Sequence, residues 1–226
     1  SAMPRLERER EILTEVMKGN VPRFWRKFVE VPVQRSHAGR TDRVVLLVAP
    51  EYLAIGSDED YFLIPVSPEV AQAIADRIDC VLPTRKIVDE IHRAAPVKLK
   101  PARIPPSPAM TSVPVFEEHN ETVPRQRAET LAAHPLGTLI AGHKKDVVCT
   151  PRLLEDPGKV AIYGWHELDG KRIQPLYLGH TSNWVDYSHG ARFVRKSVTV
   201  NGNLGSIESV LADPEVAGLF SNEGPI

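Results

Sequence analysis

The sequence contains few of the features that mark several common classes of protein. Only two cysteines are present, Cys80 and Cys149, so a disulfide scaffold is excluded, and their separation rules out a CxxC site. We favour two free thiols over one bridge. The longest uninterrupted apolar run, Val44 to Ala49, is far shorter than the roughly 20 residues that span a bilayer. We therefore expect no membrane-spanning segment.

An excess of charge of one sign is also missing. Lys and Arg number 28 against 29 Asp and Glu, and the basic residues are spread along the chain. Proteins that bind nucleic acid concentrate basic residues to neutralise phosphates, so we expect no nucleic-acid partner. The 226 residues, 42% of them hydrophobic, are typical of a soluble globular chain that can bury a core without metal or disulfides.

No segment has the pattern of a signal peptide. Ser1-Ala2 ahead of Met3 is typical of a cloning remnant, so a leader can have been removed, and the compartment is left open. The oligomeric state is left open as well.

Proline is the residue in excess, with 20 copies where average usage gives roughly 11. Seven of them lie in residues 96–124, which we predict to be an ordered but irregular connector with its apolar side chains buried. The connector separates a helical part, residues 1–95, from a strand-rich part, residues 125–226. We expect all three to form one compact domain.

Local signals predict the main elements of both parts. Apolar spacing predicts a helix over 6–17 that ends at Gly19, and Ser67-Pro68-Glu69 is a typical helix start. Thr84 begins another helix that Pro96 ends. Weaker patterns predict strands over 44–49, 61–65, 138–141, 146–150 and 193–200, a short helix over 125–133, and a broken helix over 207–220. The fold class is therefore α+β, with N-terminal helices packed on a mainly antiparallel C-terminal sheet.

Asp169-Gly170 predicts a two-residue hairpin turn between strands 160–168 and 171–179. Pairing Leu168 with Lys171 places His166 on one face with Ile173 and Tyr177. The other face then carries Tyr163, Trp165, Arg172, Gln174 and His180. His166 and His180 are predicted to lie about 20 Å apart, too far to act on one ion or one bond.

Histidines gather in one region: five of the eight lie between His134 and His189. They occur in three fragments that mix glycine with titratable or aromatic groups: Gly142 to Asp146, Tyr163 to His166, and Asp186 to Gly190. Loops can bring His143, His180 and His189 together, with Asp146 or Asp186 as the carboxylate. These five residues are the candidate catalytic set.

Two kinds of chemistry fit this set. Three histidines can bind a divalent metal such as zinc and leave one position for water, although no HExxH motif is present. Alternatively, a histidine held by an aspartate acts as a metal-free base, and Lys144, Lys145 or Arg192 stabilises negative charge. A cysteine nucleophile is less favoured, because neither cysteine has an evident histidine partner.

We predict a hydrolase with this His/Asp site on the C-terminal sheet, acting on a small molecule, a peptide, or a cell-wall or carbohydrate polymer. The alternative is a non-catalytic carbohydrate- or peptide-binding module with an aromatic platform. The substrate-binding candidates in both readings are Tyr163, Trp165, Gln174, Tyr187 and Arg192. A third possibility is an interaction protein whose histidines are structural.

Overall fold

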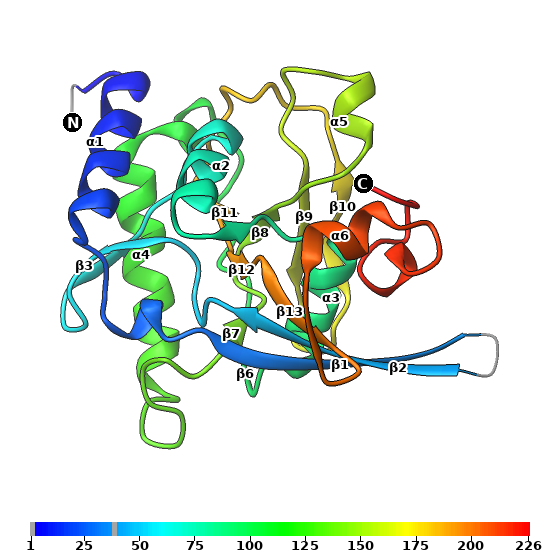
Figure 1. Cartoon of the computed structure of the whole chain (residues 1–226). Coiled ribbons are helices and arrows are strands. Elements are labelled where there is room, and N and C mark those ends of the chain that lie inside the picture. Colours follow the sequence, from blue (N-terminus) through cyan, green and yellow to red (C-terminus); the bar gives the residue numbers. More distant parts are fainter. Residues whose placement is uncertain (1–2, 38–39) are drawn as a thin grey trace.

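The computed structural model describes residues 3–37 and 40–226, and it confirms an α+β fold with mostly antiparallel sheets (Figure 1). None of the helices in these residues is long and apolar enough to cross a membrane. The α-helices are α1 (Arg5–Lys18), α2 (Pro68–Arg77), α3 (Arg85–Ala94), α4 (Val113–Ala128), α5 (Arg152–Glu155) and α6 (Ile207–Ala212). Short 3₁₀ turns occur at Phe24–Arg26, Pro108–Thr111 and Ala217–Leu219.

Two sheets carry most of the strands. A six-stranded sheet has the order β14-β13-β2-β12-β5, with β1 paired to β2, and a four-stranded sheet has the order β10-β9-β8-β11. The first is built from β1 (Val29–His37), β2 (Arg40–Val48), β5 (Cys80–Val81), β12 (Val194–Arg195), β13 (Ser197–Val200) and β14 (Asn203–Ser206). The second is built from β8 (Lys145–Val147), β9 (Ile162–His166), β10 (Arg172–Tyr177) and β11 (His189–Gly190). Two small pairs are β3 (Ala54–Gly56) with β4 (Tyr61–Leu63), and β6 (Val97–Lys98) with β7 (Ile140–Ala141).

The predicted helix boundaries are confirmed where capping residues set them. The Ser67 hydroxyl accepts a hydrogen bond from the Val70 amide at the start of α2, and Thr84 caps α3 in the same way through the Ile87 amide. Gly19 ends α1 in the left-handed conformation that glycine adopts without strain. A break follows α6 near Pro214, as predicted for the C-terminus.

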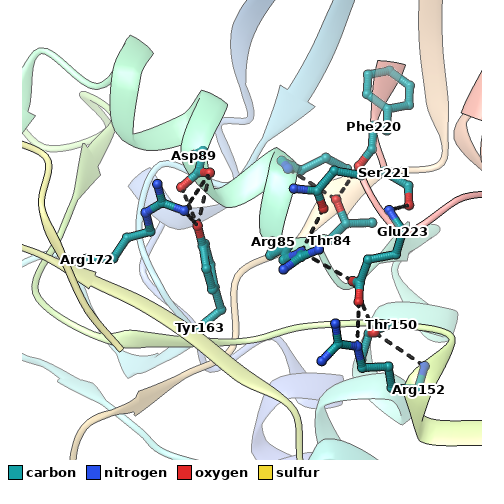
Figure 2. A network of polar contacts seen from close by, with 12 residues as sticks. Thr84, Arg85, Asp89, Thr150, Arg152, Tyr163, Arg172, Phe220, Ser221 and Glu223 are labelled. Atoms are coloured by element: carbon teal, nitrogen blue, oxygen red, sulfur yellow. Dashed lines mark hydrogen bonds and ion pairs between the residues drawn. The ribbon is translucent and has the colours of Figure 1, made fainter. Parts of the chain in front are cut away.

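Helix α3 lies between the two sheets. Ile87 and Ile91 pack on the six-stranded sheet, whereas Val88 packs against Ala161 and Tyr163 at the four-stranded sheet. The C-terminal segment is tied to the start of this helix, because Glu223 pairs with Arg85 and accepts a hydrogen bond from Thr150 (Figure 2).

The Pro-rich connector, residues 96–124, was predicted to be irregular, and this is wrong. It contains most of α4. Pro114 lies in the first turn, where its missing N–H is not needed, and only Pro124 interrupts the interior. Phe116, His119 and Val123, spaced three and four apart, form the buried face of the helix. The predicted helix over 125–133 is therefore the end of α4, which stops at Ala128.

The N-terminal part is also richer in strands than predicted. The strand expected at 44–49 is the end of β2, whose partner β1 was not predicted. In β1, Val29, Val31 and Val33 alternate with polar residues or proline, which is the pattern of a strand with one buried face. The main sheet thus draws strands from both ends of the chain.

The hairpin of β9 and β10 is confirmed, but its register and faces differ from the prediction. The Glu167 amide donates to the Lys171 carbonyl, so three residues form the loop and His166 pairs with Arg172. Gly164 and Trp165 both have positive φ, 101° and 53°, which breaks the alternation. As a result Tyr163 and His166 both reach Asp89 on α3, and the predicted separation of their faces is wrong.

Candidate functional site

Polar side chains are concentrated in the protein interior where β8 and β11 pair in parallel. His189 lies opposite Lys145, and Gly190 lies opposite Asp146. The side chains come from loops, strands and α4, and all are at least 97% buried. We call them the interior cluster: Glu51, Tyr52, His119, His143, Lys144, Asp146, Asp186 and His189.

Gly190 makes this packing possible. A Cβ atom at this position would lie 2.6 Å from Cδ1 of Tyr52 and 2.9 Å from Cβ of Lys144, distances that are too short for carbon atoms. The glycine therefore lets the Tyr52 ring approach the β8–β11 pair.

Glu51 orients His143. The two side chains are 3.0 Å apart, from Oε1 of Glu51 to Nε2 of His143, and Nδ1 of His143 has no hydrogen-bond partner in the described structure. Burial opposes ionisation of Glu51, but the neighbouring His143 and Arg192 together lower its pKa overall. An ionised carboxylate only accepts hydrogen bonds, so it holds the proton of His143 on Nε2 and leaves Nδ1 as the basic nitrogen.

Asp146 is held by a tyrosine and not by a histidine. Its Oδ2 accepts a hydrogen bond of 2.8 Å from the Tyr52 hydroxyl. Burial raises the pKa of Asp146 to about 6, although the charge of Arg192 and the Tyr52 hydrogen bond oppose the shift. Asp146 was predicted as one of two possible carboxylate partners for the histidines. The structure instead connects it to His143 only through the Tyr52 ring, whose centroid is 5.0 Å from that of His143.

Lys144 is a buried amine. Its Nζ donates to the backbone carbonyl of Tyr187, and no carboxylate forms an ion pair with it in the described structure. Burial lowers the pKa of Lys144 to about 7, while the charges of Asp186 and Glu51 act in the opposite direction. A lysine with this pKa can exchange a proton near neutral pH.

Asp186 and His189 form a second His/carboxylate pair. Nε2 of His189 lies 3.5 Å from Oδ2 of Asp186, while the Ser188 hydroxyl and amide donate to Oδ1 of the same carboxylate. Burial lowers the pKa of His189 to about 4, so the ring is neutral at pH 7.

His119, on α4, was not predicted as a site residue. Its ring packs against Tyr187 with centroids 5.0 Å apart, and burial lowers its pKa to about 2. In the described structure both of its ring nitrogens lack hydrogen-bond partners, as do both of His189 and one of His143. Buried polar atoms are usually paired, so five such nitrogens in one region are unusual.

His180 lies at the edge of the interior cluster and is partly exposed. Its ring stacks on Trp184 with centroids 5.1 Å apart, and the centroid of His189 is 6.5 Å away. The Trp184 indole in turn donates to Asp186. His166 instead stacks on His92 and pairs with Asp89, so the two histidines contact different residues.

The predicted three-histidine metal site does not form. Within residues 3–37 and 40–226, no three His, Cys, Asp or Glu side chains are arranged to hold a metal ion. His143 is directed to Glu51 and Tyr52, whereas His180 and His189 lie beside Trp184 and Asp186. The loops thus bring the predicted catalytic residues into one region but as separate pairs.

The predicted aromatic platform is not exposed. Tyr163, Trp165 and Tyr187 are all buried, and Gln174 donates only to the neighbouring Pro175 carbonyl. Arg192 is fully buried, where it donates to the Ala49 and Ile140 carbonyls and stacks on Tyr52, so its role is structural. These five residues do not form a substrate-binding surface.

Both cysteines are free thiols. Burial raises the pKa of Cys80 to about 12 and that of Cys149 to about 11. Neither is activated as a nucleophile, because nucleophilic cysteines need a lowered pKa.

The sequence signal for the missed members of the interior cluster is weak. Glu51 and Tyr52 directly follow Pro50 at the end of β2, and polar residues that follow a strand often belong to sites. His119 gives no such signal, because a lone histidine in a helix is ordinary.

Comparison with protein-family models, with curated proteins and with solved structures finds no match to this chain.

Proposed function

We propose that the protein is a hydrolase and that the interior cluster is its acid–base centre. The proposal rests on one observation: His143 is oriented by Glu51 through Nε2 and keeps Nδ1 without a partner in the described structure. A carboxylate that fixes the tautomer of a histidine is the arrangement that general-base catalysis uses.

In the reaction we propose, Nδ1 of His143 takes a proton from a water molecule. The water oxygen then attacks the carbonyl or acetal carbon of the substrate, and the imidazolium is stabilised by Glu51. Lys144 is protonated in part near neutral pH and stabilises the negative charge that develops. Asp146, whose pKa is raised to about 6, supplies the proton to the leaving group, and the neutral ring of His189 donates a hydrogen bond to that group.

The surroundings of His180 suggest where a substrate enters. His180, Trp184 and Lys145 are partly exposed, whereas the neighbouring Asp186 and His189 are buried. Aromatic rings beside a cation suit sugars and peptides. We therefore propose a peptide or glycan as the substrate, the class predicted from the sequence.

A substrate panel tests this proposal. Wild-type protein is incubated with peptides, peptidoglycan and oligosaccharides, and products are detected by mass spectrometry. We expect hydrolysis of at least one class, reduced about 10²- to 10⁴-fold in the His143→Gln and Glu51→Gln variants. The matched control is His134→Gln, since His134 lies outside the interior cluster. Equal product release by wild type and His143→Gln, or none by wild type on the whole panel, would refute the proposal.

A further inference from the structure

A second polar region lies beside α3, where residues of this helix face the turn between β9 and β10. It surrounds a cavity of about 460 Å³. The charged and imidazole groups at its wall, together called the α3 pocket, are Asp89, His92, Arg93, Lys98, His166, Asp169 and Arg172. The turn between β9 and β10, residues 168–170, completes the wall.

Asp89, the partly buried acid of the α3 pocket, is already satisfied within the protein. The carboxylate of Asp89 accepts hydrogen bonds from the Tyr163 hydroxyl, at 2.9 and 3.0 Å, and from His166 at 3.2 Å. Arg172 donates to the same Tyr163 hydroxyl at 2.7 Å and lies 3.8 Å from Asp89 (Figure 2). Asp169 is exposed and accepts one hydrogen bond, from the Lys171 amide. Asp89 therefore offers little to a ligand, and Asp169 is the one acid of the wall that keeps acceptor capacity.

The basic groups keep unused donors. Lys98 donates to one carbonyl, that of Ala95, and an ammonium has three N–H donors. Arg93 pairs with Glu90 through one nitrogen, and the side chains of Arg93 and Arg172 are 63% and 53% exposed. The hydrogen-bonding capacity that remains at the pocket wall is thus mainly that of donors with positive charge.

His92 adds an unpartnered buried group. The residue is 93% buried, its ring stacks on His166 with centroids 4.3 Å apart, and Nε2 has no hydrogen-bond partner in the described structure. Gly170 borders this ring: a Cβ atom there would lie 3.9 Å from Cε1 of His92. Because residue 170 is glycine, no side chain at this turn position covers the His92 ring.

We propose that the α3 pocket binds an oxyanion, the phosphate or carboxylate group of a small molecule, through Lys98 and Arg172, with the rings of His92 and His166 at the wall beside it. Basic side chains with free donors recognise such groups by charge-assisted hydrogen bonds. The site is separate from the interior cluster, and it does not depend on the proposed hydrolase activity.

Nuclear magnetic resonance of the histidine rings tests the proposal, with inorganic phosphate and acetate as the two probes. We expect at least one probe to shift the ring signals of His92 and His166 in a saturable way, and the stronger probe identifies phosphate or carboxylate as the group preferred. Lys98→Gln should weaken binding by about tenfold, because one charged hydrogen bond is lost.

Lys171→Gln is the matched control, since Lys171 is exposed, adjoins Arg172 and does not line the cavity. It should leave the binding constant unchanged. His143→Gln should also leave it unchanged, which separates this proposal from the hydrolase. Absence of shifts with both probes, or equal binding by Lys98→Gln and wild type, would overturn the proposal and leave a structural polar network.

Discussion

Individual residues of the interior cluster combine burial with ionisable groups, which lowers stability unless the groups are paired. Lys144 forms no ion pair in the described structure, and the ring nitrogens of His119 and His189 have no hydrogen-bond partners there. Five of the eight members, His143, Lys144, Asp146, Asp186 and His189, could be predicted because glycine, histidine and aspartate recur together in the sequence. Glu51, Tyr52 and His119 could not be predicted, because only tertiary packing brings the loop after β2 and a face of α4 next to the other five members.

The shifted pKa of Lys144 predicts a dependence of stability on pH. Its pKa falls from 10.5 in the unfolded chain to about 7 in the folded protein, so the unfolded state binds more protons between these values. Burial of Lys144 therefore costs least free energy of unfolding above pH 10.5, where the amine is neutral in both states. The free energy of unfolding falls as the pH is lowered from 10.5 to 7. We expect Lys144→Met to stabilise the protein at pH 6 to 7 and to lose that advantage as the pH rises toward 10.

Urea unfolding at several pH values measures this effect as the difference between variant and wild type. Lys171→Met, at an exposed position, serves as the control and should show no such trend. A difference between Lys144→Met and wild type that stays constant with pH would mean that Lys144 remains charged in the folded protein.

Elements marked by local signals were predicted best. Ser67 and Thr84 cap their helices through side-chain hydrogen bonds, so the starts of α2 and α3 follow from the sequence. The prolines led to the prediction of an irregular segment where α4 forms. Prolines in and near a first turn do not prevent a helix. The faces of the β9–β10 hairpin depended on the positive φ of Trp165, which a residue of this type rarely adopts and which no local pattern indicates.

The parallel pair of β8 and β11 depends on Gly190. Gly190→Ala would force a Cβ atom against Tyr52 and Lys144, so we expect the free energy of unfolding to fall by about 1–3 kcal/mol. Gly205→Ala, in β14, is the matched control, because nothing lies within 4 Å of its Cβ position. Chemical denaturation of both variants measures the effect. Equal stability of the two would show that Tyr52 moves aside without cost.

The whole molecule is held together by strands from distant parts of the chain. β2 pairs with β1 on one side and with β12 and β13 on the other, so residues 1–95 and 125–226 share the main sheet. The connector is packed on both, with Val97, Leu99 and Phe116 buried. Most of these strand pairings join residues far apart in the sequence, and local sequence patterns do not indicate them. The patterns therefore predicted the α+β class but placed too few strands in residues 1–95.

Separation of the chain should therefore destroy the fold. We expect fragments 1–95 and 96–226, each purified alone, to show no cooperative thermal transition by circular dichroism, because each would expose one edge and one face of the six-stranded sheet. The intact chain under the same conditions is the reference. A sharp transition in either fragment would indicate two independent folding units.

The most direct test of the central claim, that the interior cluster serves chemistry and not folding, is the His189→Gln variant. Turnover, on the substrate that wild type hydrolyses, and melting temperature are measured on one preparation. We predict a fall in turnover of about 10²- to 10⁴-fold with little change in melting temperature, because neither ring nitrogen of His189 makes a hydrogen bond in the described structure. Unchanged turnover, or a strongly lowered melting temperature, would contradict the account and assign His189 a structural role.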